Sequence, residues 1–132
     1  TKLKLIPTYS YARIYKKGDV LKRHKDRFSC EISTTMFLGG EQWDLYLEPN
    51  KNVSKISNGT YIPSTNKGIK INLKQGDMLI YSGCELEHWR EAFQGINCCQ
   101  VFLHYNQVNS PGAVENRFDG RPFLGLPSWF KK

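Results

Sequence analysis

The sequence contains no hydrophobic run near the roughly 18 apolar residues that a membrane-spanning helix needs. Its N-terminus has no apolar stretch followed by a small-residue cleavage site, so no signal peptide is indicated. Both absences favour a cytoplasmic protein with no membrane partner. The chain also begins at Thr1 instead of methionine, which leaves open whether it is a fragment of a longer protein.

Paired cysteine motifs are also missing. The four cysteines are Cys30, Cys84, Cys98 and Cys99, and they include no C-x-x-C pair that could form a zinc knuckle. Two disulfides would be typical of a small secreted protein, but nothing indicates secretion. Adjacent Cys98 and Cys99 would point to opposite faces of a strand. We therefore expect four reduced thiols.

No segment combines an amphipathic helical pattern with a cap and a stop signal, and no internal repeat is present. Short stretches rich in β-branched and aromatic residues alternate instead with turn formers such as Gly18 and Gly76. This pattern predicts an all-β sandwich, barrel or jelly roll. The expected strands are residues 9–15, 20–25, 28–38, 43–47, 68–73, 77–81 and 97–105.

A chain of 132 residues with 39% hydrophobic and 13% aromatic residues is sufficient for one packed domain, which we take as residues 1–132. Residues 49–67 are polar and rich in turn formers, as in a lid or binding loop. Residues 106–132 lose the strand pattern but keep apolar side chains that we expect to strap back over the core: Phe118, Phe123, Leu124, Leu126, Trp129 and Phe130.

Acidic residues are few: 12 Asp and Glu oppose 19 Lys and Arg, giving a formal charge of +7 and a pI near 9.3. Such a balance favours anionic partners, including nucleic acid, acidic protein surfaces and small dicarboxylates, without choosing among them. The basic clusters at residues 16–17 and 22–25 are too short to be tails, and the simplest interpretation is a solvated strand face.

Histidine is scarce too, with three in the chain, and two of them occur in informative patterns. His24 and Asp26 are two residues apart, so on a strand both side chains would project from one face. His88 follows 64 positions later, after a turn at Gly76 and a hydrophobic strand. Two histidines and one carboxylate on one face of a metal form the facial triad of non-haem Fe(II) oxygenases.

These segments resemble the Fe(II)/2-oxoglutarate-dependent dioxygenases, specifically the prolyl 4-hydroxylase-like branch. The matching parts are residues 15–26, residues 76–81 with His88, and the hydrophobic strand 101–105. The resemblance covers residues 9–105 in a consistent order and implies a double-stranded β-helix, a jelly roll of about eight strands, followed by the strap at 106–132. Related enzymes usually carry N-terminal supporting helices, so either a segment is missing here or the domain is a minimal version.

By this resemblance His24, Asp26 and His88 bind Fe(II). The co-substrate 2-oxoglutarate chelates the iron, O₂ takes a remaining position, and the co-substrate is decarboxylated to succinate and CO₂ as the substrate is hydroxylated. The expected substrate is a small molecule or a peptide, with a prolyl group suggested by the branch alone.

The far carboxylate of 2-oxoglutarate should need a buried cation and a hydroxyl. The family usually places an Arg or Lys where this sequence has residues 97–100, so it departs from the pattern there. The leading candidate is Arg90, two residues after His88, with Tyr15 as the hydroxyl and Gln100 or Tyr11 assisting. The alternative is a surface Arg90 that pairs with a neighbouring glutamate, Glu87 or Glu91.

The remaining polar and aromatic candidates have simpler explanations. His104 lies in an apolar strand, where a core role is more common than a role in a pocket. Arg27 is a candidate either to anchor substrate or to orient the carboxylate of Asp26. We interpret the tryptophans as core or lining residues: Trp43, Trp89 and Trp129.

Two other functions are open on the sequence. A catalytically inactive jelly-roll module that binds a metal or small ligand would explain the missing family cation. A basic all-β nucleic-acid-binding domain would interleave aromatic and cationic residues, and residues 9–17 come nearest to that pattern. That stretch is better explained as a strand with inward tyrosines, so we do not expect nucleic acid as a partner.

Overall fold

β-Branched and aromatic residues form ten strands within residues 2–120, the part of the chain that the computed structural model describes. No α-helix occurs in that range, and hence none that is long and apolar enough to cross a membrane. The strands are β1 (Leu5–Lys16), β2 (Leu21–His24), β3 (Ile32–Gly40), β4 (Leu45–Leu47), β5 (Lys55–Ser57), β6 (Thr60–Ile62), β7 (Ile69–Ile71), β8 (Met78–Ser82), β9 (His88–Arg90) and β10 (Asn97–Gln107).

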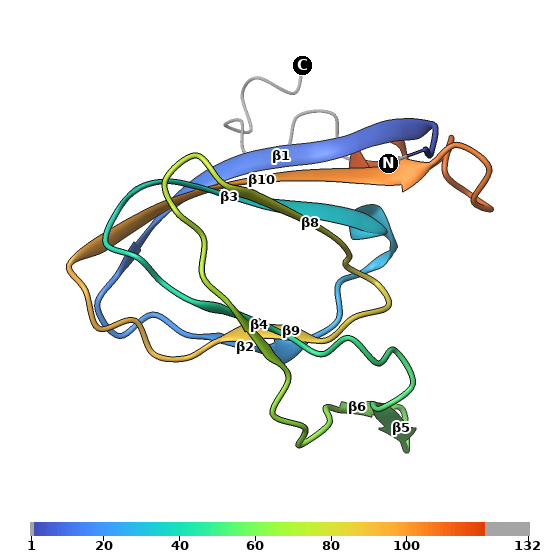
Figure 1. The fold of residues 1–132 in the computed structure, drawn as a ribbon. Coiled ribbons are helices and arrows are strands. Elements are labelled where there is room, and N and C mark those ends of the chain that lie inside the picture. The colour runs from blue at the N-terminus through green and yellow to red at the C-terminus, as the bar shows by residue number, and fades with distance from the viewer. Residues whose placement is uncertain (1, 121–132) are drawn as a thin grey trace, which may run out of the picture.

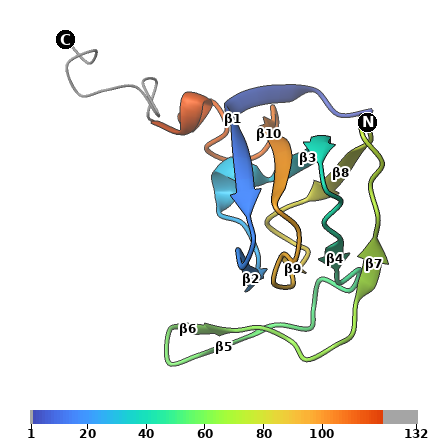
Figure 2. The ribbon, with the colours of Figure 1, turned by 90° about the vertical axis from the view of Figure 1, so that its left-hand side faces the viewer.

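Eight of the strands form two four-stranded antiparallel sheets, and the remaining two form a separate hairpin. The first sheet has the order β1-β10-β3-β8 and the second has the order β2-β9-β4-β7. Figure 1 shows the two sheets as facing layers, and Figure 2 shows the strands of each layer side by side. Outside the hairpin, the chain crosses between the layers at every step except from β4 to β7. This order is a double-stranded β-helix, which confirms the predicted jelly roll.

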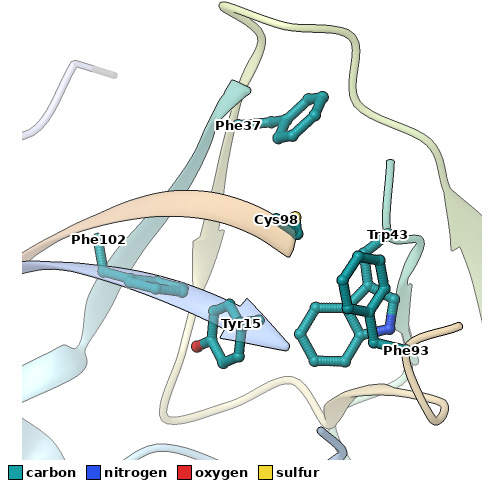
Figure 3. Packing of buried hydrophobic residues seen from close by; sticks show 6 residues of the cluster. All are labelled: Tyr15, Phe37, Trp43, Phe93, Cys98 and Phe102. Carbon is teal, nitrogen blue, oxygen red and sulfur yellow. The ribbon is translucent and has the colours of Figure 1, made fainter. Parts of the chain in front are cut away.

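An apolar cluster fills one end of the space between the sheets. Alternate residues of β10 point inward, and two of them, Cys98 and Phe102, are 0% and 7% exposed. Figure 3 shows these side chains with the rest of the cluster: Tyr15, Phe37, Trp43 and Phe93. Further along β10 the inward residue is His104, which lies opposite Ser33. The inward residues of β10 therefore include polar ones, Gln100 between the two apolar side chains and His104 beyond them.

Two strand predictions need correction. Residues 28–38 do not form one strand, because Phe28–Cys30 is a 3₁₀ turn, η1, closed by a hydrogen bond from Glu31 N to Phe28 O, and β3 begins at Ile32. Residues 88–90 were not expected as a strand, yet they pair with both β2 and β4. A three-residue strand is too short to show an alternating pattern in the sequence.

The segment 49–67 is not entirely irregular. Strands β5 and β6 form a hairpin there, and its turn residues Asn58 and Gly59 have positive φ angles of 48° and 73°. Asn-Gly is the preferred pair for such a two-residue turn. The hairpin extends from the second sheet, away from the first (Figure 1).

The segment after β10 follows the predicted strap only in part. Residues Arg117–Gly120 form a second 3₁₀ element, η2, and Arg27 holds it through a 2.7 Å ion pair with Asp119. Phe118, expected to cover the core, lies beside residues of β1 and β10 but is 46% exposed, so it covers them only in part. The other apolar residues of the expected strap lie outside the described residues: Phe123, Leu124, Leu126, Trp129 and Phe130.

The four cysteines are all free thiols, as predicted. Cys98 is buried and the adjacent Cys99 is partly exposed, which fits their opposite directions on β10.

Candidate metal centre

The two sequence-predicted histidines meet at the ends of paired strands. His24 is the last residue of β2, His88 is the first residue of β9, and the two are direct partners in the ladder. Their ring centroids are 4.3 Å apart. Asp26 lies two residues beyond the end of β2, where its backbone N–H donates to Gly83 O at 2.8 Å. That backbone bond holds Asp26 beside the strand although it has left the ladder.

The donor atoms of these three residues converge. Asp26 Oδ1 is 3.4 Å from His24 Nε2 and 3.6 Å from His88 Nε2. Two ligand atoms that bind one ion at about 2.1 Å and at right angles lie about 3 Å apart. These donor atoms would therefore need to move only slightly closer together to bind a single ion. Two imidazole nitrogens and one carboxylate oxygen on one face are the donor set of non-haem iron sites. The residues therefore fit a divalent transition metal.

The second nitrogen of each ring fixes its tautomer. His24 Nδ1 is 2.7 Å from Lys22 O, and His88 Nδ1 is 3.1 Å from Leu86 O. A carbonyl only accepts, so each Nδ1 carries the proton in the neutral ring and each Nε2 keeps its lone pair. Backbone carbonyls commonly orient metal-binding histidines in this way.

The electrostatics favour an ionised Asp26. Burial disfavours the carboxylate, but its contacts with the imidazoles of His24 and His88 and the hydrogen bond from Ser33 outweigh burial and hold the pKa of Asp26 well below its usual range. Burial also disfavours a charged His24, yet the hydrogen bond to Asp26, the carbonyl of Lys22 and the charge of Asp26 together outweigh it and raise the pKa of His24. The side chains of His24, Asp26 and His88 are 35%, 16% and 3% exposed, so the group opens on the His24 side.

Two supporting residues were not predicted from the sequence. Ser33 Oγ donates to Asp26 Oδ2 at 2.9 Å. Gly83 leaves the space for this contact, because a Cβ there would lie 2.5 Å from both Asp26 Oδ2 and Ser33 Oγ. Neither residue carries a signal in the sequence, since each matters only through its distance from Asp26 in the folded chain.

Arg90 points inward, as predicted, and is 2% exposed. Its Nη1 donates to Trp43 O, its Nη2 lies 3.4 Å from Thr35 Oγ1, and its guanidinium carbon is 5.1 Å from the centroid of a Trp43 ring. No carboxylate within residues 2–120 forms an ion pair with it, and burial lowers the pKa of Arg90. The alternative of a surface Arg90 paired with Glu87 or Glu91 is therefore wrong.

Of the other predicted co-substrate residues, Gln100 and Tyr15 lie near this guanidinium, whereas Tyr11 is 43% exposed. Gln100 Oε1 accepts a hydrogen bond from Thr35 Oγ1 at 3.0 Å, so Thr35 links Gln100 to Arg90. Tyr15 is 7% exposed, and its hydroxyl makes no hydrogen bond to any residue in the described range. Burial raises the pKa of Tyr15, while the charges of Arg13 and Arg90 oppose that rise.

Tyr81 is a further inward residue that sequence reasoning treated only as part of a strand. Its ring contacts that of His88 edge-on, with centroids 4.9 Å apart. Burial raises the pKa of Tyr81 well above its usual value; the charge of Asp26 adds to the rise and that of Arg90 opposes it. The Tyr81 hydroxyl is therefore within electrostatic reach of both the metal ligand and the buried cation.

The remaining candidates take structural positions. Arg27 pairs with Asp119 and lies 5.2 Å from the centroid of Tyr9, so it does not orient Asp26. His104 is buried, with Nδ1 3.0 Å from Ser33 Oγ. Trp43 and Trp89 are 7% and 9% exposed, as expected for core or lining residues, and Trp129 lies outside the described range.

The segment 49–67 is anchored behind the metal ligands. Arg23 Nη1 donates to Ser64 O at 2.8 Å and to Asn66 O at 2.7 Å. Arg23 also lies 3.7 Å from the centroid of a Trp89 ring. Because side chains alternate along a strand, Arg23 and Trp89 face away from His24 and His88. The anchored part of this loop is thus not a lid over the triad.

No protein-family model matches the sequence, and no curated protein matches it. Among solved structures, the chain is similar to the Cupin_2 domain of an XRE family transcriptional regulator from Enterobacter cloacae, with 10% identity, 81% of this chain and 100% of that chain covered, and a TM-score of 0.42. It is also similar to an RmlC-like cupin protein from Desulfovibrio desulfuricans, with 11% identity, 76% and 81% coverage, and a TM-score of 0.37.

Both similar structures are cupins, which are jelly rolls. At these TM-scores neither carries a conclusion about function, and the assignment of the fold depends on the strand order. Neither similarity points to the prolyl 4-hydroxylase-like branch.

Proposed function

We propose that this protein is an Fe(II)- and 2-oxoglutarate-dependent oxygenase that hydroxylates a small molecule or a peptide. The observation that carries the proposal is the convergence of His24 Nε2, His88 Nε2 and Asp26 Oδ1, with both histidine tautomers set by backbone carbonyls. Three protein ligands on one face leave the other positions of an octahedral ion for co-substrate and O₂.

Arg90 supports a dicarboxylate co-substrate. A buried guanidinium without a carboxylate partner is unfavourable, since desolvation of the charge is not offset by an ion pair. An anion that enters the interior would offset it, and a planar guanidinium can hold a carboxylate through two parallel hydrogen bonds. In this proposal Arg90 binds the far carboxylate, while Thr35 and the free hydroxyl of Tyr15 complete the pocket.

The protein's own residues would bind, orient and exclude water. A ferrous ion held by the triad would supply the oxidising chemistry that turns 2-oxoglutarate, O₂ and a substrate C–H bond into succinate, CO₂ and a hydroxylated product. Lys22 O and Leu86 O keep the imidazoles oriented. The apolar cluster around Phe102 and Trp43 closes the interior at the other end, which limits entry of water to the His24 side.

A prolyl or other peptidyl substrate is the finer form of this proposal and depends on the family resemblance of residues 9–105. Substrate would enter on the His24 side, because that ligand is the most exposed of the three.

A second candidate is a jelly-roll module that binds a metal or small ligand without catalysis. Two observations favour it: residues 97–100 replace the cation that the family usually has there, and the guanidinium of Arg90 already bonds Trp43 O and Thr35. Such a module would bind metal through the same triad but would not turn over 2-oxoglutarate.

The deciding experiment adds Fe(II) and 2-oxoglutarate under anaerobic conditions and then admits air. We expect a weak visible charge-transfer band from chelated 2-oxoglutarate, followed by slow formation of succinate without substrate. His24→Ala should abolish both. Glu85→Ala, which removes an exposed carboxylate paired with Lys51, is the control and should change neither. Metal binding with no band and no succinate would favour the second candidate, and no metal binding would exclude both.

A further inference from the structure

Ser33 lies between Asp26 and His104 in the interior of the jelly roll. Its Oγ is 2.9 Å from Asp26 Oδ2 and 3.0 Å from His104 Nδ1. Ser33 is 0% exposed and His104 is 5% exposed, so solvent has little access to this chain of contacts. We propose that His104 is a positioning residue for the metal-binding carboxylate of Asp26 and acts through the Ser33 hydroxyl. This inference rests on the proposed metal site.

The Ser33 hydroxyl has a single proton, and this proton decides which group donates in each of the two hydrogen bonds. An ionised Asp26 only accepts hydrogen bonds, so the 2.9 Å contact is favourable when Ser33 donates to it. Ser33 Oγ must then accept from His104, which requires the proton on Nδ1. With the proton on Nε2, the Nδ1 lone pair would compete for the hydroxyl proton, and Asp26 Oδ2 would face a lone pair of Ser33.

His104 also limits where the hydroxyl can turn. Ser33 Oγ lies 3.1 Å from Cys30 O, a second acceptor for the same proton. An N–H from His104 takes up one lone pair of Oγ and fixes the orientation of the hydroxyl. Without it, the hydroxyl would divide between Cys30 O and Asp26.

The other nitrogen of His104 agrees with this tautomer. His104 Nε2 is buried and has no hydrogen-bond partner within residues 2–120. An unprotonated Nε2 leaves only a lone pair there, whereas a protonated one would leave a buried donor unpaired. Burial lowers the pKa of His104, which keeps the ring neutral.

Asp26 needs such support because it lies outside the strand ladder. Its backbone is held by Gly83 O, but its side chain is oriented by Ser33 and the two histidines. Partners behind a metal ligand typically change metal affinity by about 10- to 100-fold.

A competing use of the same side chains is a second metal site, because donor atoms of Asp26, Cys30 and His104 lie within 4.8 Å of one another. Burial raises the pKa of the Cys30 thiol to about 11, so the thiol is protonated near neutral pH and is a poor ligand. The Nδ1 proton of His104 likewise faces Ser33. These side chains therefore fit the orientation of Asp26 better than they fit a second metal site.

The test is a titration with Co(II) alone, followed by visible absorption, of the wild type and matched variants. Ser33→Ala and His104→Ala should each weaken Co(II) binding about 10-fold. The double variant should be no weaker than Ser33→Ala, since both residues act on Asp26 by one route. His104→Asn, whose amide N–H can replace Nδ1–H, should restore binding to within about threefold of wild type. Thr34→Ala removes a buried hydroxyl on the other face of β3 that accepts from Leu103 N; it should lower stability but leave Co(II) affinity unchanged.

Several results would overturn the inference. They are His104→Asn binding as weakly as His104→Ala, additive losses in the double variant, Ser33→Ala binding like the wild type, or two Co(II) ions per chain. In the wild type, ¹⁵N shifts of the His104 ring should show a protonated Nδ1 and an unprotonated Nε2, and the opposite tautomer would also overturn it. A wild type that binds no Co(II) would instead refute the proposed function on which the inference rests.

Discussion

Arg23 Nε lies 3.0 Å from Glu87 Oε2, and these two residues directly precede the metal-ligand candidates His24 and His88. The contact is an ion pair without a hydrogen bond from Nε, and Glu87 is 0% exposed. Tyr61 and Ser64 of the segment 49–67 donate to the same carboxylate at 2.7 Å and 2.6 Å. One buried charge pair thus joins β2, β9 and the loop behind them.

Breaking that pair should destabilise the fold. Glu87→Ala leaves Arg23 with only the more distant carboxylate of Glu48, at 4.0 Å, and removes the acceptor for Tyr61 and Ser64. We therefore expect a loss of about 3 kcal/mol in the free energy of unfolding. Urea denaturation measures the loss. Glu85→Ala breaks only the exposed Lys51–Glu85 pair and should cost less than about 1 kcal/mol. Equal effects of the two substitutions would contradict a structural role for the buried pair.

Metal should stabilise the folded chain through the triad. At a Co(II) concentration about 100 times its Kd, the free energy of unfolding should rise by about 2.7 kcal/mol, and chelation should reverse the gain. His24→Ala and Asp26→Ala should lose this gain, because each removes one of three donors. Thermal melting with and without Co(II) is the measurement. If either variant is stabilised by Co(II) as much as the wild type, the metal binds at another site.

Gly83→Ala should damage the triad without replacing any of its three residues. The added Cβ would lie 2.4 Å from Cys30 O and 2.5 Å from Asp26 Oδ2, so the backbone or the carboxylate has to move. We expect Co(II) affinity to fall by about 10-fold or more. Gly76→Ala is the comparison: its Cβ would meet nothing within 4 Å, although its φ of +90° is strained for alanine. It should lower stability yet keep Co(II) affinity, and equal affinities in the two variants would contradict the steric argument.

Arg90→Met separates co-substrate binding from stability. The substitution keeps much of the volume but removes a buried cation that has no carboxylate partner among residues 2–120, so the metal-free protein should be about as stable as the wild type or more stable. Isothermal titration with 2-oxoglutarate in the presence of Co(II) should show affinity reduced by at least about 10-fold, the loss of a charge-assisted pair. Co(II) affinity should not change. If Arg90→Met binds 2-oxoglutarate as tightly as the wild type, Arg90 does not bind the co-substrate.

Much of the first sheet was predictable because its long strands alternate between inward and outward side chains. β10 shows this from Cys98 to Asn106, and the expected strand 97–105 matches it closely. β9 was missed because His88–Arg90 is short and buried on all three residues, so no alternation exists to detect. The hairpin β5–β6 had a usable signal in Asn58-Gly59, which was interpreted as part of an irregular loop.

The sequence by itself identified the candidate ligand set. The spacing of His24 and Asp26, the hydrophobic strand before His88, and the scarcity of histidine limited the choice to these residues, and the position of Arg90 two residues after His88 predicted its inward direction. Only the tertiary structure decided what surrounds them. Ser33, Gly83 and His104 come from separate parts of the chain and reach Asp26 only because β2 and β9 of one sheet face β3 and β10 of the other. Such contacts form only when the two sheets pack face to face, so the spacing of residues along the sequence does not indicate them.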